Sequence, residues 1–330
     1  MAVSMSRALT GCGHRVSLLA CRSRRTAMPL YVDLDRCVMS RRSAMDAVLS
    51  PLDLMVWFTQ NVDEMPIFRT ICPSVRHIAA ALWHTNVSLR GSMLMSFDMV
   101  LCPNQDLMRI LTEYLPVESM VQFPWDYGMA PRHQPWEFLA GRLEAYMPID
   151  NYTLKRYSYE IFEAIRRIQR RTRHLHFTLS TFSSLERHAS SFIRALVSAG
   201  RCTWLRSPLP VEHEMQLYKS DVVISPTVRT ESGWFARQAM ECGVPVVAFD
   251  LPPMHEFLRH EINARLVRCD LDFRWPGVPT AVPDFGSLVD EVVQLAEKQA
   301  NIKKLCPPWG KISRNQHDFV TRCCSLAGRL

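Results

Sequence analysis

Short apolar runs alternate with longer amphipathic stretches along this chain, and this alternation restricts its fold more than any other feature. Residues 175–181 and 245–249 form two such runs, each of strand length and without an acidic residue, a lysine or an arginine. Residues 157–173 form one of the longer stretches, with Ile161 and Ile165 on a single helical face. Strands that alternate with helices in this way are typical of an α/β protein built on a parallel sheet, which is the fold class that we predict.

A proline-rich segment divides the alternation into two halves. Pro124, Pro131 and Pro135 fall within this segment. The chain has 330 residues, which is enough for two domains. Two successive α/β halves predict two doubly wound, Rossmann-like lobes. We place an amino-terminal lobe at 1–123, a linker at 124–138, a carboxy-terminal lobe at 139–312 and a terminal helix at 313–330.

The sequence does not indicate a membrane-spanning or a zinc-binding protein. No apolar run approaches the roughly 18 residues that a transmembrane helix needs. The 11 cysteines show neither a Cys-x-x-Cys pair nor the Cys/His spacing of a zinc site. Arg7, Arg15, Gly11 and Gly13 interrupt the apolar residues near the amino terminus, so no signal peptide is predicted. We predict a cytoplasmic protein with free thiols and no zinc site.

Positive charge is in excess and is concentrated in one segment. The chain carries a formal net charge of +7 and has an isoelectric point of about 8.9. This balance favours an anionic partner such as a phosphate ligand, a membrane surface or nucleic acid. Residues 155–173 hold seven Lys and Arg and two acids, a net charge of +5. The arginines of the predicted helix form either a solvated face or an acceptor-binding surface.

One segment in the second half carries the clearest functional signal. A strand ends at Pro226, and a polar loop with Arg229 and Glu231 follows. A helix then begins at Gly233, and a glycine turn leads into the next strand. The unpaired N–H groups and the positive dipole end at the start of a helix bind anions. This order of elements holds a nucleotide diphosphate at the carboxyl edge of a sheet, so we predict a nucleotide site here.

This segment resembles retaining glycosyltransferase family 4, whose members have the two-lobed GT-B fold. Residues 238–247 read Q-A-M-E-C-G-V-P-V-V and are similar to the family's E-A-M-A-x-G-x-P-V-V. Residues 8–16 resemble the family's A-L-x-x-x-G-H-x-V, which lies in a helix that follows a first strand and a glycine-rich loop. The resemblance therefore implies either an amino lobe that lacks its first strand or a true start upstream of Met1.

The resemblance also implies an enzyme that transfers a hexose from a nucleotide-diphosphate sugar, UDP-linked, with retention of configuration. The donor is a co-substrate, and the family implies no cofactor and no metal. The acceptor stays open between a glycan or lipid-linked precursor, with peripheral membrane contact, and a hydroxymethylated base in DNA, as in phage DNA glucosyltransferases. A catalytically inactive GT-B protein that binds a partner is the alternative from another class, and the altered acids described next favour it.

The family's two glutamates, eight positions apart, are both replaced in this chain. The second falls on Gln238, which the resemblance implies would bind the ribose, since an amide can still pair with a hydroxyl. The first falls on Thr230, with Glu231 one step out of register, and one of these two would contact the sugar. In the amino lobe, His84 follows a predicted strand at the position where the family places a histidine that faces the sugar.

Three basic residues match or replace the family's contacts to the donor diphosphate. Lys155 or Arg156 corresponds to the family's lysine, and Arg229 is a replacement for its arginine. Positive charge beside a leaving phosphate stabilises the charge that develops in the transition state. Pro226 and Gly233 complete the predicted donor site, at the end of the strand and the start of the helix.

Overall fold

The chain divides into two units, Met1–Gly128 with Arg314–Leu330, and Met129–Ser313. The computed structural model describes residues 54–57, 76–80, 94–123, 142–181, 187–200, 202–206, 208–229, 233–272, 280–298, 302 and 305. His84, Thr230 and Glu231 lie outside the described residues, as does the terminal helix that we predicted at 313–330. Their predicted roles therefore stay predictions.

The first unit contains a four-stranded parallel sheet. Its strands lie in chain order: β1 (Leu54–Trp57), β2 (Arg76–Ala80), β3 (Met99–Cys102) and β4 (Met120–Gln122). Helix α5 (Gln105–Leu111) follows β3, and its start is capped by Asn104, whose side-chain oxygen accepts from the Leu107 N–H at 2.7 Å. A short 3-10 turn, η1 (Val117–Ser119), leads into β4. The absence of a first strand remains a prediction, because it concerns residues outside those described.

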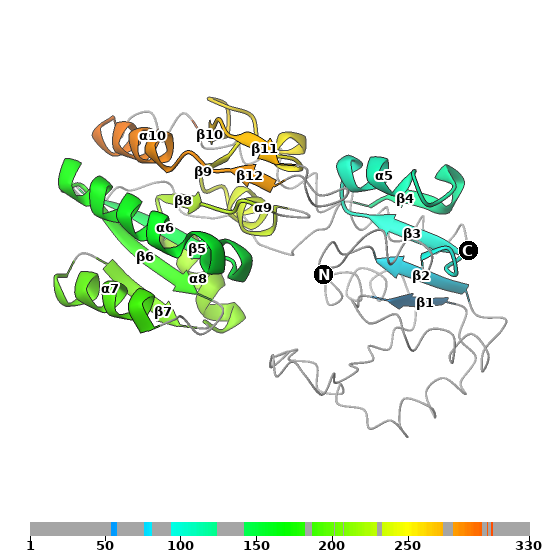
Figure 1. Cartoon of the computed structure of the whole chain (residues 1–330), viewed down its shortest axis with the longest axis horizontal. Coiled ribbons are helices and arrows are strands. Elements are labelled where there is room, and N and C mark those ends of the chain that lie inside the picture. The colour runs from blue at the N-terminus through cyan, green and yellow to red at the C-terminus, as the bar shows by residue number, and fades with distance from the viewer. Residues whose placement is uncertain are drawn as a thin grey trace, which may run out of the picture. The chain divides into compact units, whose positions relative to one another are not determined.

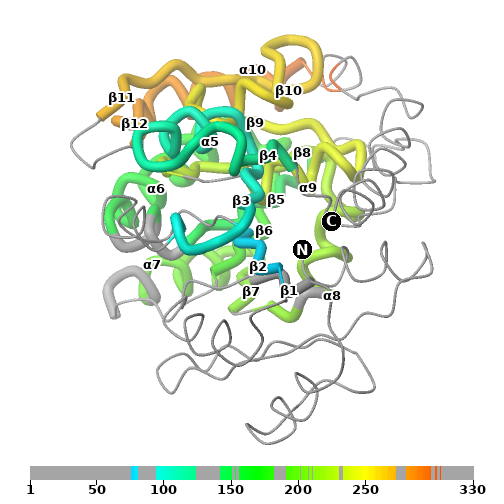
Figure 2. The backbone as a smooth tube through the Cα atoms, turned by 90° about the vertical axis from the view of Figure 1, so that its right-hand side faces the viewer, coloured from blue at the N-terminus to red at the C-terminus, as the bar shows by residue number. Residues whose placement is uncertain are grey.

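The second unit is built on a six-stranded parallel sheet whose strand order reverses once. The order is β10-β9-β8-β5-β6-β7, and Figures 1 and 2 show the path of the chain through it. Along the sequence the chain runs from β5 to β6 and β7, then returns to the other side of β5 for β8, β9 and β10. The strands are β5 (Leu143–Ile149), β6 (Leu175–Thr181), β7 (Cys202–Arg206), β8 (Val222–Ser225), β9 (Val246–Phe249) and β10 (Ala264–Val267). The predicted doubly wound α/β fold is confirmed in this unit.

Helices follow the strands of this sheet and pack against it. Helix α8 packs on β5, α9 on β8 and β9, and α6 lies against both α7 and α10. A small antiparallel pair of strands completes the unit. The bounds are α6 (Asn151–Arg171), α7 (Arg187–Ser198), α8 (Pro210–Lys219), α9 (Trp234–Glu241), η2 (Met254–Glu256), β11 (Asp270–Asp272), β12 (Thr280–Val282) and α10 (Phe285–Glu297).

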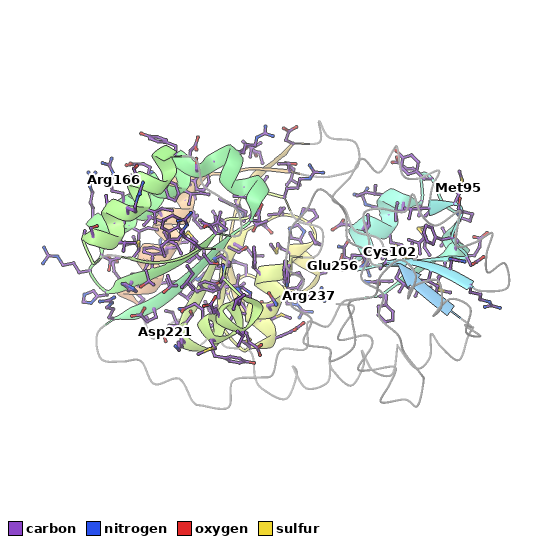
Figure 3. The ribbon with its side chains drawn as sticks, turned by 90° about the horizontal axis from the view of Figure 1, so that it is seen from below. Met95, Cys102, Arg166, Asp221, Arg237 and Glu256 are labelled. Carbon is purple, nitrogen blue, oxygen red and sulfur yellow. The ribbon has the colours of Figure 1, made fainter. Side chains whose placement is uncertain are left out.

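A reciprocal pair of hydrogen bonds joins β8 to β5, the two strands between which the order reverses. The Glu144 N–H donates to the Asp221 carboxylate, and the Asp221 N–H donates to the Glu144 carbonyl, both at 2.8 Å. Asp221 is buried directly before β8 and is labelled in Figure 3. The pair fixes the register in which Ala145 and Tyr146 lie opposite Val222 and Val223.

Helix α6 begins six residues earlier than the sequence predicts. Asp150 caps it, since its Oδ1 accepts from the Thr153 N–H at 2.8 Å. Tyr157, where we predicted the start, has φ −131° and ψ 26° and kinks the helix. The prediction was wrong because the apolar period is interrupted at the kink. As a result, Lys155 and Arg156 lie inside the first segment of α6 rather than before it.

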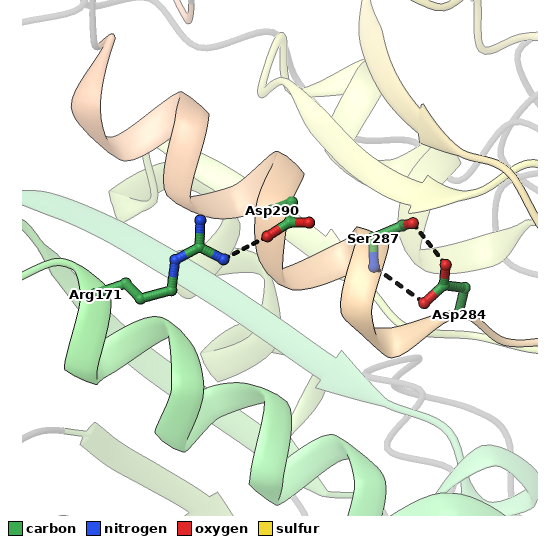
Figure 4. Close-up of polar contacts among 4 residues, drawn as sticks. All are labelled: Arg171, Asp284, Ser287 and Asp290. Atoms are coloured by element: carbon green, nitrogen blue, oxygen red, sulfur yellow. Dashed lines mark hydrogen bonds and ion pairs between the residues drawn. The ribbon is translucent and has the colours of Figure 1, made fainter.

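Arg166 and Arg171, two of the arginines in residues 157–173, are paired within the second unit. Arg166 lies 2.8 Å from Glu163, one turn away on α6. Arg171 pairs with Asp290 of α10, near the point where Asp284 caps that helix through Ser287 (Figure 4). Such exposed pairs contribute little stability, but they give these arginines local acidic neighbours. This favours a solvated face over an acceptor-binding surface for this part of α6.

The described cysteines are free, as predicted. Cys102, Cys202 and Cys242 are buried and Cys269 is half-buried. Burial raises the pKa of Cys102 to about 12 and that of Cys202 and Cys269 to about 11, so these three are thiols at neutral pH. No helix in the described part of the chain has the length and apolar character needed to cross a membrane.

Candidate functional site

The carboxyl ends of β5 and β8 meet where the strand order reverses, which is the place where open α/β sheets bind ligands. One hydrogen-bonded side chain connects the segments that follow these two strands. Thr153, fully buried at the start of α6, accepts from the Val228 N–H at 3.2 Å and donates to Asp150 at 2.6 Å. This threonine therefore ties the loop after β8 to the start of α6.

The loop after β8 holds two of the predicted site residues, Pro226 and Arg229. Pro226 is buried, and Arg229 is half-buried at the end of the described part of the loop. The Ser225 hydroxyl donates to the Thr227 hydroxyl at 3.1 Å inside the unit. The Val228 carbonyl accepts from the Ala281 N–H at 2.7 Å. These bonds fix the backbone that leads to Arg229.

Gly233 is the residue before α9 and has a left-handed backbone, with φ 63° and ψ 37°. A Cβ atom here would lie 2.5 Å from Cζ of Phe257 and 3.0 Å from Sδ of Met254. Both the backbone angle and the close approach therefore require glycine. The Arg237 guanidinium, labelled in Figure 3, lies over the Phe257 ring, 4.5 Å from its centre. Helix α9 starts where the sequence predicts a helix N-terminus, and its first N–H groups form a positive dipole end.

The predicted basic residues lie at the same edge of the sheet as this helix start. Helix α6 begins directly after β5, so Lys155 and Arg156 occupy its first turns at the carboxyl edge. Arg156 is exposed, with its guanidinium 5.8 Å from the centre of the Tyr157 ring. The backbone of Lys155, Arg156, Arg229 and Gly233 thus lies at one edge of the sheet.

Gln238, the predicted ribose residue, is buried and belongs to a chain of hydrogen bonds that the sequence does not reveal. Its side-chain oxygen lies 3.0 Å from Nε2 of His213 on α8. Nδ1 of His213 lies 2.6 Å from the Tyr146 hydroxyl on β5. A lone histidine and a lone tyrosine, far apart in the sequence, give no sequence signal of this contact. Burial lowers the pKa of His213 and raises that of Tyr146, so both groups are neutral at pH 7.

The buried histidine predicts a dependence of stability on pH. Its pKa lies below the ordinary value of 6.5 in the folded chain, so the unfolded chain binds the proton more readily. The stabilisation is complete above pH 6.5 and is lost as the pH falls toward the folded-state pKa, by up to about 1.4 kcal/mol per pH unit. We expect His213→Gln to flatten this slope in urea unfolding measured between pH 7.5 and 5. His176→Gln is the matched control, since His176 has a lowered pKa but is only half-buried and should change the slope less.

The described residues contain no group of three or more His, Cys, Asp or Glu arranged to hold a metal ion. Neither protein-family models nor curated proteins match the chain. Solved structures do match. Because their sequence identities to this chain are low, these matches show the fold alone.

Three of these structures indicate the fold. A glycosyltransferase of Rickettsia africae has a TM-score of 0.62 and 10% identity, with 98% of this chain and 94% of that one covered. The pneumococcal O-GlcNAc transferase GtfA, in complex with UDP and GlcNAc, has a TM-score of 0.65 and 10% identity over 87% of this chain. A mutant of S. aureus TarM, in complex with fondaparinux, α-GlcNAc-glycerol and UDP, has a TM-score of 0.62 and 12% identity over 83% of this chain. The match spans 59% of GtfA and 55% of TarM. The chain therefore has the GT-B fold.

Proposed function

We propose that this chain is a glycosyltransferase that moves a hexosyl group from a UDP-sugar to a hydroxyl acceptor with retention of configuration. The observation that carries the proposal is the site where the strand order reverses between β5 and β8. There the start of α9, the loop after β8 and the first turns of α6 lie at one edge of the sheet. Similarity to glycosyltransferases, two of them in complexes with UDP, supports it.

Each residue of this edge has a role in the proposed reaction. The bond between the anomeric carbon and the β-phosphate oxygen breaks, and UDP leaves with the electron pair. The acceptor oxygen takes its place and gives its proton to the departing phosphate oxygen. Lys155, Arg156 and Arg229 would stabilise the negative charge on the leaving diphosphate, together with the N–H groups that follow Gly233. Because these groups supply positive charge, we propose that no metal is required and expect turnover in the presence of EDTA.

The remaining contacts follow the family resemblance. Gln238 would bind the ribose, and Glu231 or Thr230 would contact the sugar. His84 would face the sugar from the amino lobe. We propose a glycan or a lipid-linked precursor as the acceptor, and a cytoplasmic location, since free thiols suit a reducing compartment.

Donor hydrolysis tests the proposal without knowledge of the acceptor. The protein is incubated with UDP-glucose, UDP-N-acetylglucosamine or UDP-galactose carrying a labelled sugar, with and without EDTA, and release of UDP is measured. We expect slow release from at least one donor, and no release from the corresponding GDP-sugars. Titration with UDP by calorimetry is run in parallel.

Two other outcomes identify the alternative functions. If UDP neither binds nor is released from any donor, the enzyme proposal is wrong and the inactive partner protein is the correct interpretation. If hydroxymethylated duplex DNA accepts the labelled sugar, and its binding weakens steeply with salt, DNA replaces the glycan as acceptor.

A further inference from the structure

We propose that His213 is a positioning residue for Gln238: it holds the amide oxygen of Gln238 and so directs the amide nitrogen, a hydrogen-bond donor, toward the ribose of the nucleotide. The inference rests on the proposed function, because that function assigns the ribose to Gln238. It adds a residue from α8 to the donor site, and it specifies which atom of Gln238 the ligand meets.

The contacts that support this inference join three elements of the second unit. Tyr146 lies on β5, opposite Val223 of β8, where the strand order reverses. His213 lies on α8, which packs on β5, and Gln238 lies on α9. The three side chains belong to residues that are 0%, 5% and 7% exposed, so water is largely excluded from the two hydrogen bonds between them. The imidazole also packs between the rings of Tyr146 and Phe235, at centroid distances of 5.4 and 5.7 Å.

The direction of these hydrogen bonds follows from the atoms involved. An amide oxygen only accepts, so Nε2 of His213 carries the proton that is donated to Gln238 at 3.0 Å. A neutral imidazole has one donor and one acceptor, so Nδ1 accepts from the Tyr146 hydroxyl at 2.6 Å. Burial keeps both groups neutral, which agrees with this assignment. The result is a one-way chain in which Tyr146 donates to His213 and His213 donates to Gln238, and such chains strengthen each bond.

This arrangement changes what the site offers to a nucleotide. A glutamate at position 238 would present a second carboxylate oxygen, which can only accept. A glutamine held by its oxygen presents NH₂ instead, which can only donate. The ribose hydroxyl contacted by Gln238 must then act as the acceptor in that bond. A hydroxyl can do so, because it carries both a proton and lone pairs.

Two substitutions at position 213 separate positioning from packing. Counted in bonds from Cβ, the amide nitrogen of glutamine matches Nε2 of histidine, whereas that of asparagine matches Nδ1. His213→Gln therefore keeps a donor near Gln238, and His213→Asn removes that donor while it keeps a polar group near Tyr146. Gln238→Ala serves as the reference for complete loss of the ribose contact.

The readout is the ratio of affinities for UDP and 2′,3′-dideoxy-UDP, measured by calorimetry at pH 7.5. We expect the unaltered chain and His213→Gln to bind UDP about 5- to 10-fold more tightly than the dideoxy ligand, as one hydrogen bond predicts. We expect this ratio to fall to about one in His213→Asn and Gln238→Ala. The ¹⁵N chemical shifts of the imidazole in the unaltered chain should identify the tautomer protonated on Nε2.

The other outcomes overturn the inference, and each does so in a distinguishable way. If both substitutions at position 213 weaken the two ligands by the same factor, His213 only packs. If the ratio persists in His213→Asn, Gln238 is held by other contacts. A tautomer protonated on Nδ1 contradicts the direction of the chain. If the unaltered chain binds no UDP at all, the proposed function fails and this inference fails with it.

Discussion

Replacing Gly233 with alanine is expected to lower the free energy of unfolding of the carboxy-terminal unit by about 2–5 kcal/mol. About 1–2 kcal/mol comes from forcing an L residue into the left-handed backbone conformation, with φ 63°. A further 1–3 kcal/mol or so comes from the new Cβ, which would lie 2.5 Å from the ring of Phe257. The measurement is urea unfolding followed by circular dichroism.

Gly200 provides a matched control within the same unit. It has nearly the same backbone angle, φ 64°, but a Cβ there would meet nothing within 4 Å. We expect Gly200→Ala to cost only the conformational part, about 1 kcal/mol. The double substitution Gly233→Ala/Phe257→Leu replaces the ring with a smaller side chain, so it should restore part of the lost free energy of unfolding. Equal losses at the two glycines would contradict the importance of the contact with Phe257.

Replacing Lys155 with alanine is expected to reduce the turnover of a UDP-sugar donor by about 10²- to 10³-fold. The residue lies in the first turns of α6 at the carboxyl edge of β5, where we propose that the diphosphate leaves. A positive group that meets charge only as it develops contributes most to turnover and less to ground-state binding. We therefore expect kcat for donor hydrolysis to fall much more than the affinity for UDP.

Arg170→Ala is the control for this second prediction. Arg170 is an exposed cation in the last turn of the same helix, at the opposite edge of the sheet. Its substitution should leave turnover within about twofold of that of the unaltered chain. Arg156→Ala and Arg229→Ala are measured alongside it. If Lys155→Ala turns over normally and one of these two does not, the contact to the diphosphate belongs to that arginine.

Much of the sheet could be predicted from the sequence because its central strands are buried on both faces. Such strands appear as continuous apolar runs, and β6 has the bounds that we predicted, at 175–181. Strands β4 and β10 were missed, since M-V-Q and A-R-L-V are too short and too mixed in polarity to stand out. Each is an edge strand that pairs only with the strand before it in the chain. The start of α6 was missed because its cap precedes the apolar period.

The candidate site could be predicted only where a local pattern marks it. Gly233 is visible because a strand, a loop and a helix surround it in sequence, and Gln238 because it begins a family motif. Tyr146 and His213 are 67 residues apart, and His213 is 25 residues from Gln238. The packing of α8 on β5, of α9 on β8 and the pairing of β5 with β8 bring them together, so no local pattern predicts their contact.

The bond between Thr153 and Val228 joins segments 75 residues apart, and this has a thermodynamic consequence. The loop after β8 and the start of α6 meet only when the sheet is complete, so a nucleotide that binds across them binds the folded chain and not the unfolded one. A free nucleotide concentration of about 100 times Kd would then stabilise the unit by about 2.7 kcal/mol. Ligand-dependent melting temperature therefore measures the integrity of this junction, independently of catalysis.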